Sequence, residues 1–353
     1  MNIKIKKIKI FLKYMLIYFE LFSLIYFIMN KSSYIPNTNA NNIKNSKIFK
    51  LLKQNLINKI FKVIKRNLTH VNSIYITGKA RFGNFLIAIN KAIIACELLD
   101  CKKIIIINNK FVFINHTIFY PKYNITIQPN QSFFDNDSLI LNNWFFYGFK
   151  IHLGYINRLI ILKDEILNNL PKIKIHRDDL SIYIRSGDIF STHNKWIFLY
   201  PQPPLCFYEN ILNTFKFRLV NIISEDNFNP VIPILLKKYS FIKFKRNSIK
   251  NDIAYLANSF NLVSAMSSFL ISIIKLNDKI KFLWEYDFYT STEKYRHLHH
   301  SVYSFAYNYT IYKMNPSLKY QMFMYPWNNT KEQKEMMIKE ECQQNFIIIK
   351  PRI

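Results

Sequence analysis

Arg185, Gly187 and Asp188 directly follow the apolar, β-branched run 180–184. An arginine at the carboxyl end of a strand can present a fork of N–H groups to a diphosphate. Gly187 permits a sharp turn of the backbone, and Asp188 can fix the arginine or accept a hydrogen bond from a ligand hydroxyl. The same residues could instead form an ion pair that braces a turn. On chemistry alone, both interpretations stay open.

Arg81, Gly83 and Asn84 follow a second apolar run, 73–77, and precede a helical pattern. Free backbone N–H groups at a helix start favour an anion, Asn84 suits the N-cap, and Arg81 adds a cation. A simple capped helix is the alternative. The spacing matches neither G-x-G-x-x-G nor a Walker loop, which argues against a dinucleotide dehydrogenase and a P-loop ATPase.

Ser267 and Ser268 lie between an apolar run, 262–265, and another helical pattern. Hydroxyl groups and helix N–H groups together can hold a phosphate, although serines there can also act as ordinary N-caps. Because this is the third strand end suited to an anion, the three together favour a ligand site over three unrelated caps.

The apolar patterns alternate between strands and helices. We expect strands at 73–77, 104–107, 180–184, 218–224, 241–244, 262–265 and 280–284. We expect helices at 84–99, 205–212, 231–239, 249–258 and 267–276. This alternation predicts an α/β protein with parallel sheets, arranged as two Rossmann-type domains that face a cleft. We place the domains at 71–178 and 179–353, and make no assignment of elements within 108–178.

The N-terminus carries five lysines followed by an apolar stretch. Residues 10–29 would form a helix about 30 Å long, enough to span a bilayer core. The preceding lysines predict a cytosolic N-terminus. We therefore expect a cytosolic tail at 1–13, a type II signal anchor at 14–30 and a stem at 31–70, with a cleaved signal peptide as the rival.

The net charge of +27 does not point to nucleic acid, because the lysines are spread along the chain and no nucleic-acid-binding motif concentrates them. The chain contains no C-x-x-C pair, so the cysteine spacing does not indicate a zinc site. Cys96 and Cys101 could form a disulfide or remain two thiols. Two pairs of carboxylate residues, at 135/137 and 225/226, have a spacing that could bind a metal ion. A turn is preferred for the first pair, whereas a metal site and a solvated loop stay equally open for the second. Because arginine and helix N–H groups can neutralise a diphosphate without either pair, no metal is expected.

The three motifs also carry a family resemblance. Residues 80–84 resemble the Gly-Arg-(Leu/Phe)-Gly-Asn-Gln element of α1,2- and protein O-fucosyltransferases, 183–188 resemble their His-x-Arg-x-Gly-Asp motif, and 264–269 resemble their serine-rich motif. Ala80, Phe85 and Tyr183 stand where that family has glycine, glutamine and histidine. The resemblance implies a GT-B fold, GDP-fucose as donor, inversion without a required metal, and a type II membrane anchor in the Golgi or the endoplasmic reticulum.

The expected activity is transfer of fucose from GDP-fucose to a glycan or glycoprotein acceptor. We expect Arg185 to neutralise the leaving β-phosphate and Asp188 to be the first candidate base, ahead of His193 and Glu225. The expected donor-binding residues are Arg81, Gly83, Asn84, Gly187, Ser267 and Ser268. The alternatives are another inverting GT-B nucleotide-sugar transferase, a lumenal lectin-like protein without turnover, and a basic protein that binds membrane surfaces or nucleic acid.

Overall fold

A computed structural model of the chain separates two compact units, residues 1–70 and 71–353. The structure describes residues 71–77, 82–107, 117–120, 124–129, 138–142, 155–191, 200–265, 267–288, 308–342 and 345–351. The predicted tail, anchor and stem lie outside these residues. Within them, no helix combines the length and the apolar character that a membrane span requires.

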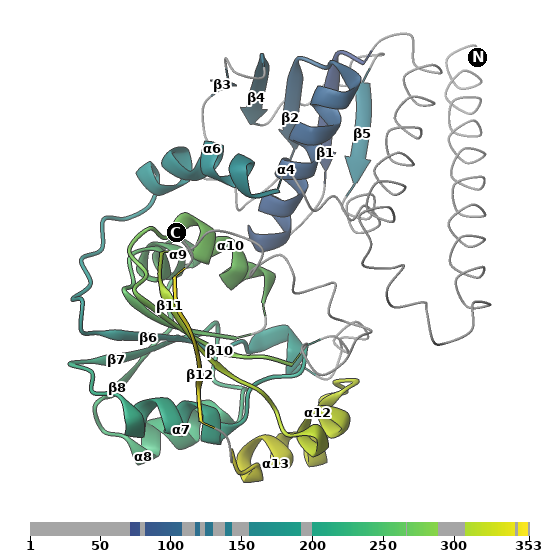
Figure 1. Cartoon of the computed structure of the whole chain (residues 1–353). Coiled ribbons are helices and arrows are strands. Elements are labelled where there is room, and N and C mark those ends of the chain that lie inside the picture. The colour runs from purple at the N-terminus through teal and green to yellow at the C-terminus, as the bar shows by residue number, and fades with distance from the viewer. Residues whose placement is uncertain are drawn as a thin grey trace. The chain divides into compact units, whose positions relative to one another are not determined.

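The first part of the second unit contains a five-stranded sheet, with strand order β3-β4-β2-β1-β5 (Figure 1). Its elements are β1 (Ser73–Thr77), α4 (Phe82–Leu99), β2 (Lys103–Ile107), β3 (Ile118–Tyr120), β4 (Ile125–Pro129), β5 (Ser138–Asn142) and the following helix α6 (Tyr155–Asn168). All pairings are parallel except β3 with β4. The isoleucines of β2 are mostly buried, as expected for a strand covered on both faces.

The second part contains a seven-stranded sheet, with strand order β12-β11-β10-β9-β6-β7-β8. Its strands are β6 (Leu180–Tyr183), β7 (Val220–Ile223), β8 (Ile242–Lys245), β9 (Asn261–Ser264), β10 (Phe282–Tyr286), β11 (Thr310–Met314) and β12 (Ile347–Ile349). Only the β11–β12 pairing is antiparallel. Read from β8 to β11, the order is that of a doubly wound, Rossmann-like sheet, whose winding reverses between β6 and β9.

Helices cover both faces of this sheet. Figure 1 shows α7 (Leu205–Thr214) and α8 (Val231–Lys238) below it, and α9 (Ile249–Ala257) and α10 (Ser268–Leu276) above it. The apolar faces of α7 and α8 bury a continuous core with the strands, including Ile182, Ile222 and Trp284. On the other face, α9 and α10 bury apolar residues of their own, among them Ile253 and Leu270. The chain ends with α12 (Leu318–Met324), α13 (Lys331–Lys339) and the edge strand β12.

The predicted α/β class and parallel sheets are confirmed, and every strand and helix predicted between residues 73 and 284 overlaps an observed one. The helix expected at 10–29 lies outside the described residues. One boundary matters for the site. The helix predicted from Asn84 begins at Phe82, so Asn84 lies inside its first turn and the prediction that it is the N-cap was wrong. The range 108–178, for which no elements were predicted, contains β3, β4, β5 and α6.

Candidate active site

Arg185 lies just beyond the carboxyl end of β6, where the winding of the sheet reverses. Open α/β sheets bind ligands in the crevice outside their carboxyl ends at this reversal. The residue is only 8% exposed. A buried guanidinium must be paired, because an isolated charge in the interior is costly.

The Arg185 guanidinium has partners for its two terminal nitrogens. Its Nη2 donates to Asp188 at 2.8 Å from Oδ1 and 3.2 Å from Oδ2, and its Nη1 donates to Ser267 Oγ at 3.2 Å. The guanidinium carbon lies 5.2 Å from the centre of the Tyr200 ring. In contrast, Nε is buried and has no hydrogen-bond acceptor among the described residues. The Nε–H group and the second N–H of Nη1 therefore have no acceptor among the described residues.

The surroundings of Arg185 keep it charged. Burial by itself lowers the pKa of the guanidinium, but Tyr183 and Asp188 raise it, and the net shift is upward. Burial also raises the pKa of the Tyr183 hydroxyl. The site therefore presents a permanent cation beside a neutral phenol.

The turn after Arg185 depends on Gly187. Its φ is +61°, a left-handed conformation that favours glycine, and a Cβ atom there would overlap the side chain of Glu225. Asp226 Oδ1 accepts hydrogen bonds from Ser186 Oγ and from Gly187 N at 3.1 Å. Asn229 Nδ2 donates to Arg185 O at 3.0 Å. The loop after β7 thus holds the backbone of the Arg185 loop.

Ser267 links the arginine to the start of α10. It is the N-cap of that helix, and its Oγ accepts from Phe269 N at 3.2 Å as well as from Arg185. The first turn of a helix carries N–H groups without intrahelical acceptors, which favour an anion. A phosphate placed here would meet both Arg185 and the helix start.

The C-terminal helices brace the other side of the site. Trp327 Nε1 donates to Ile189 O at 2.9 Å, and Tyr320 Oη donates to Gln202 O at 2.8 Å. A disulfide joins Cys206 of α7 to Cys342, which follows α13. Segments more than a hundred residues apart in sequence therefore fix the stretch of chain that follows Arg185, at Ile189, Gln202 and Cys206.

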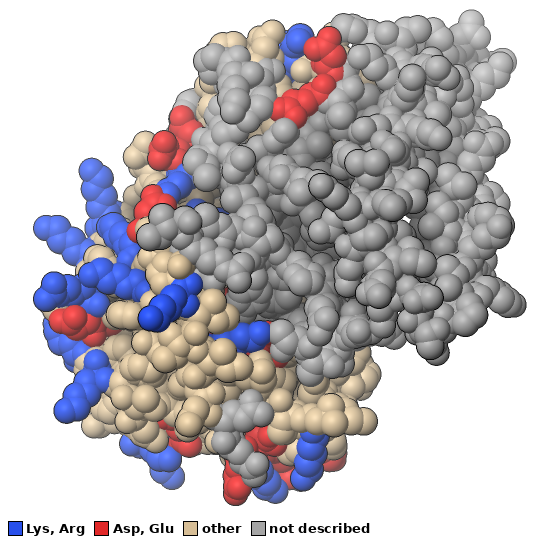
Figure 2. All heavy atoms as spheres, in the orientation of Figure 1, with Lys and Arg blue, Asp and Glu red and all other residues tan. Residues whose placement is uncertain are grey.

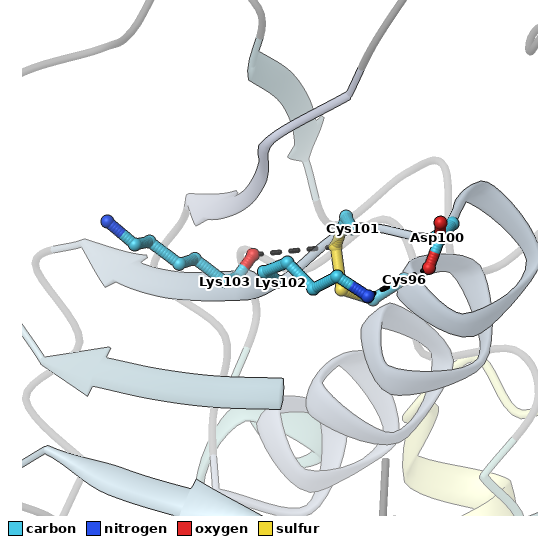
Figure 3. Close-up of a disulfide and its surroundings, with 5 residues drawn as sticks. All are labelled: Cys96, Asp100, Cys101, Lys102 and Lys103. Atoms are coloured by element: carbon cyan, nitrogen blue, oxygen red, sulfur yellow. Dashed lines mark hydrogen bonds and ion pairs between the residues drawn. A yellow bond between two sulfur atoms is a disulfide. The ribbon is translucent and has the colours of Figure 1, made fainter. Parts of the chain in front are cut away.

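The second disulfide joins Cys96 and Cys101, at the end of α4 and just before β2 (Figure 3). Lys102 Nζ contacts Asp100 Oδ1 at 2.9 Å beside it. All four cysteines of the chain are paired. Of the two possibilities left open by the sequence, the disulfide is the one found, and the Cys206–Cys342 pair was not anticipated.

The structure brings together Arg185, Gly187, Asp188 and Ser267, with Ser268 as the first residue of α10. Gly83 is buried in the first turn of α4, and its neighbour Phe82 has its ring 5.9 Å from that of Phe269. Arg81, His193 and the carboxylate pair at 135/137 lie outside the described residues. In the part of the chain that is described, no three metal-type side chains gather.

Four residues that shape the site were missed by sequence reasoning: Tyr200, Asp226, Asn229 and Trp327. The sequence suggested Asp226 as a metal ligand and not as a residue that holds the Arg185 loop. Its position just after a predicted strand was the signal that could have placed it near the site. The others carry no local pattern, because their contacts with the Arg185 loop arise only on folding.

Neither a family model nor a curated protein matches this chain. Its function must therefore be inferred from the residues and their geometry.

Proposed function

We propose that the chain is a glycosyltransferase that transfers fucose from GDP-fucose to a glycan or glycoprotein acceptor, with inversion and without a metal. The proposal includes a GT-B arrangement of the two sheet-containing parts. It also includes a type II membrane anchor and a lumenal active site in the Golgi or the endoplasmic reticulum.

One observation carries the proposal. Arg185 is buried at the reversal point of the sheet, is held through both terminal nitrogens, and keeps a buried Nε without an acceptor among the described residues. A structural ion pair does not require an unused donor, whereas a diphosphate ligand would accept from it. The start of α10 beside it favours the same kind of ligand.

In the proposed reaction, the acceptor hydroxyl oxygen attacks the anomeric carbon of the donor sugar. The bond from that carbon to the β-phosphate oxygen breaks, and GDP leaves with the bonding electrons. Arg185 and the N–H groups of α10 stabilise the negative charge that develops on the phosphate. Because these donors are fixed before the reaction, they need little reorganisation as the charge appears.

A base must accept the proton of the acceptor hydroxyl. The geometry favours Asp188 as the residue that positions Arg185, and not as this base. Both of its carboxylate oxygens contact Arg185 Nη2, which suits a positioning residue. Glu225, which is exposed and adjacent to Gly187, is a candidate base within the described residues. Separate substitutions of Asp188 and Glu225 by their amides would distinguish these roles through the pH dependence of kcat.

The disulfides support a lumenal location. Disulfides persist in secretory compartments and are rare in the cytosol. Both pairs lie in the unit that follows residue 70, and one of them spans 136 residues. This agrees with the orientation expected from the N-terminal lysines.

A donor screen tests the proposal. The full-length protein in detergent is heated with GDP, UDP or CMP, and the melting temperature is measured. Specific binding raises it by mass action, so GDP alone should give a saturable increase. Arg185→Ala should lose that increase, whereas Lys319→Ala, which removes an exposed cation from α12, should retain it. Stabilisation by UDP or CMP would favour another nucleotide-sugar transferase. Binding of GDP without sugar transfer to any acceptor would favour the lectin-like alternative.

A further inference from the structure

A cavity lies near the amino ends of the strands in the seven-stranded sheet, opposite the carboxyl ends where Arg185 is found. It has a volume of about 370 Å³, and its lining includes residues at the amino ends of four strands, among them Arg177, Phe217, Asn261 and Lys281. It is open to solvent, and its volume lies near the lower end of the range of known small-ligand pockets. The Arg185 site lies beyond the carboxyl ends of the strands, so the two are separate.

Aromatic rings form the apolar wall of this cavity. Trp284 stacks on Tyr312 with the ring centres 5.3 Å apart, and the Phe217 ring lies 5.7 Å from Trp284. Phe282 belongs to the same lining and remains 37% exposed. An apolar face of a ligand ring would find its complement here.

Hydrogen-bonding groups accompany these rings. Trp284 is 1% exposed, and its Nε1 is buried without an acceptor among the described residues. Asn261 Nδ2 donates to Arg177 O at 2.8 Å and to Asp179 O at 2.9 Å, which fixes the amide so that its oxygen remains as an acceptor. Trp284 Nε1 is enclosed in the core, so the Asn261 oxygen is the group of this pair that a ligand hydroxyl could use, as an acceptor.

The rim of the cavity is basic. Its charged residues are Arg177, Lys216 and Lys281, against a single carboxylate, Asp178. Arg177 Nε lies 3.8 Å from Asp178, while the two lysines are exposed. Figure 2 shows Lys and Arg side chains gathered on the left of the described surface, the side from which the chain enters β6 in Figure 1. The excess of positive charge favours an anionic ligand.

We propose that this cavity binds a saccharide that carries an anionic substituent. The partly exposed rings suit the apolar face of a sugar, the Asn261 amide oxygen suits a hydroxyl group, and the lysines suit the anion. The site does not depend on the proposed transferase activity, because none of its residues contacts the Arg185 site in the described contacts.

Isothermal titration of the full-length protein in detergent tests this proposal, with a sulfated disaccharide as the probe. The matched probes are the unsulfated disaccharide and inorganic sulfate. We expect the sulfated disaccharide to bind at least about tenfold more tightly than either, since a charge-assisted hydrogen bond contributes about that factor. Its affinity should fall as salt increases.

Variants locate the binding. Lys216→Ala combined with Lys281→Ala should weaken it about tenfold or more. Phe282→Ala, which removes an exposed ring of the lining, should weaken it severalfold. Lys319→Ala combined with Lys331→Ala removes the same charge from α12 and α13 and should leave it unchanged. Arg185→Ala should also leave it unchanged, which separates this site from the donor site. Circular dichroism checks that each variant is folded.

Equal binding of inorganic sulfate and the sulfated disaccharide would overturn the proposal in favour of a simple charged surface. So would equal effects of the two lysine pairs, or the absence of binding at millimolar concentrations. Loss of this binding with normal fucose transfer, or the reverse, would show which of the two proposals had failed.

Discussion

Cations lie at both ends of the strands in the seven-stranded sheet, but the protein holds them differently. We call the side where the parallel strands end the carboxyl edge and the side where they begin the amino edge. At the carboxyl edge, Arg185 is 8% exposed and fixed by Asp188, Ser267 and the Tyr200 ring. At the amino edge, Lys216 and Lys281 are exposed beside aromatic rings. A buried, fixed cation acts strongly on a charge that develops next to it, whereas exposed cations are screened by salt. The first arrangement suits catalysis and the second suits reversible binding.

The carboxyl edge also depends on distant parts of the chain, since Trp327 and Cys342 come from its last thirty residues. The amino edge uses residues at or near the starts of its own strands. Phe346, which also belongs to these last residues, packs against the Phe215 and Tyr312 rings of the cavity lining, so both edges of the sheet contact the C-terminal segment.

The largest expected effect is on stability, from removal of the Cys206–Cys342 disulfide. In the chain-entropy model, a link across 136 residues contributes about 5 kcal/mol, and the Cys96–Cys101 link across 5 residues about 2 kcal/mol. Replacing each pair by alanine and measuring urea unfolding should give this order. The reverse order would show that the long link does not constrain the unfolded chain.

The next effect concerns pH at the carboxyl edge. Burial raises the pKa of Asp252 to about 7; the hydrogen bond from Asn247 opposes this shift and Glu225 adds to it. Because the folded-state pKa is above the unfolded one, the stabilisation is complete below about pH 4 and is lost as pH rises through 7. The free energy of unfolding should fall by at most about 4 kcal/mol more in the wild type than in Asp252→Asn over that range. Parallel pH profiles of unfolding in the two proteins would contradict this.

Arg185→Ala should lower fucose transfer by about 30- to 1,000-fold, since loss of a fixed cation removes about 2–4 kcal/mol of transition-state stabilisation. Arg185→Lys should recover only part, because an ammonium group cannot form the planar fork. Initial rates with GDP-fucose measure both, with Lys319→Ala as the control. Near wild-type turnover in the alanine variant would make Arg185 a structural residue and abolish the contrast between the edges.

Two buried tryptophans provide a smaller, matched test. Trp327 donates to Ile189 O near the Arg185 loop, whereas Trp284 Nε1 has no acceptor among the described residues. Replacement by phenylalanine removes similar volume from each, so the difference reports the hydrogen bond. Trp327→Phe should cost about 1–2 kcal/mol more than Trp284→Phe in urea unfolding. Equal costs would indicate that the bond does not brace the carboxyl edge.

Removal of metal should have the smallest effect. Asp226 Oδ1 already accepts from Ser186 and Gly187, so this oxygen serves the loop. Arginine and helix N–H groups can neutralise a diphosphate without a cation. Fucose transfer should therefore continue unchanged in EDTA. A loss of activity that Mn²⁺ restores would require a carboxylate pair in the site and a different mechanism.

The sequence by itself determined the alternation of strands and helices in the second sheet, because apolar runs of strand length separate helical patterns there and each element buries its own face. It also placed Arg185, Gly187, Asp188 and Ser267 at strand ends. Residues 108–178 show no comparable pattern, because β3, β4 and β5 are short, and β4 and β5 are stabilised by pairing with strands earlier in the sequence, β2 and β1.

Only the tertiary structure decided which strand ends meet and what they can bind. The placement of β9 beside β6 brings Ser267 to Arg185, although the two are 82 residues apart. Asp226, Asn229 and Trp327 then complete the enclosure that fixes the arginine, and the aromatic cavity forms where the amino ends of several strands converge. Local propensity encodes elements, but the partners of a buried charge depend on contacts that exist only once the sheet has formed.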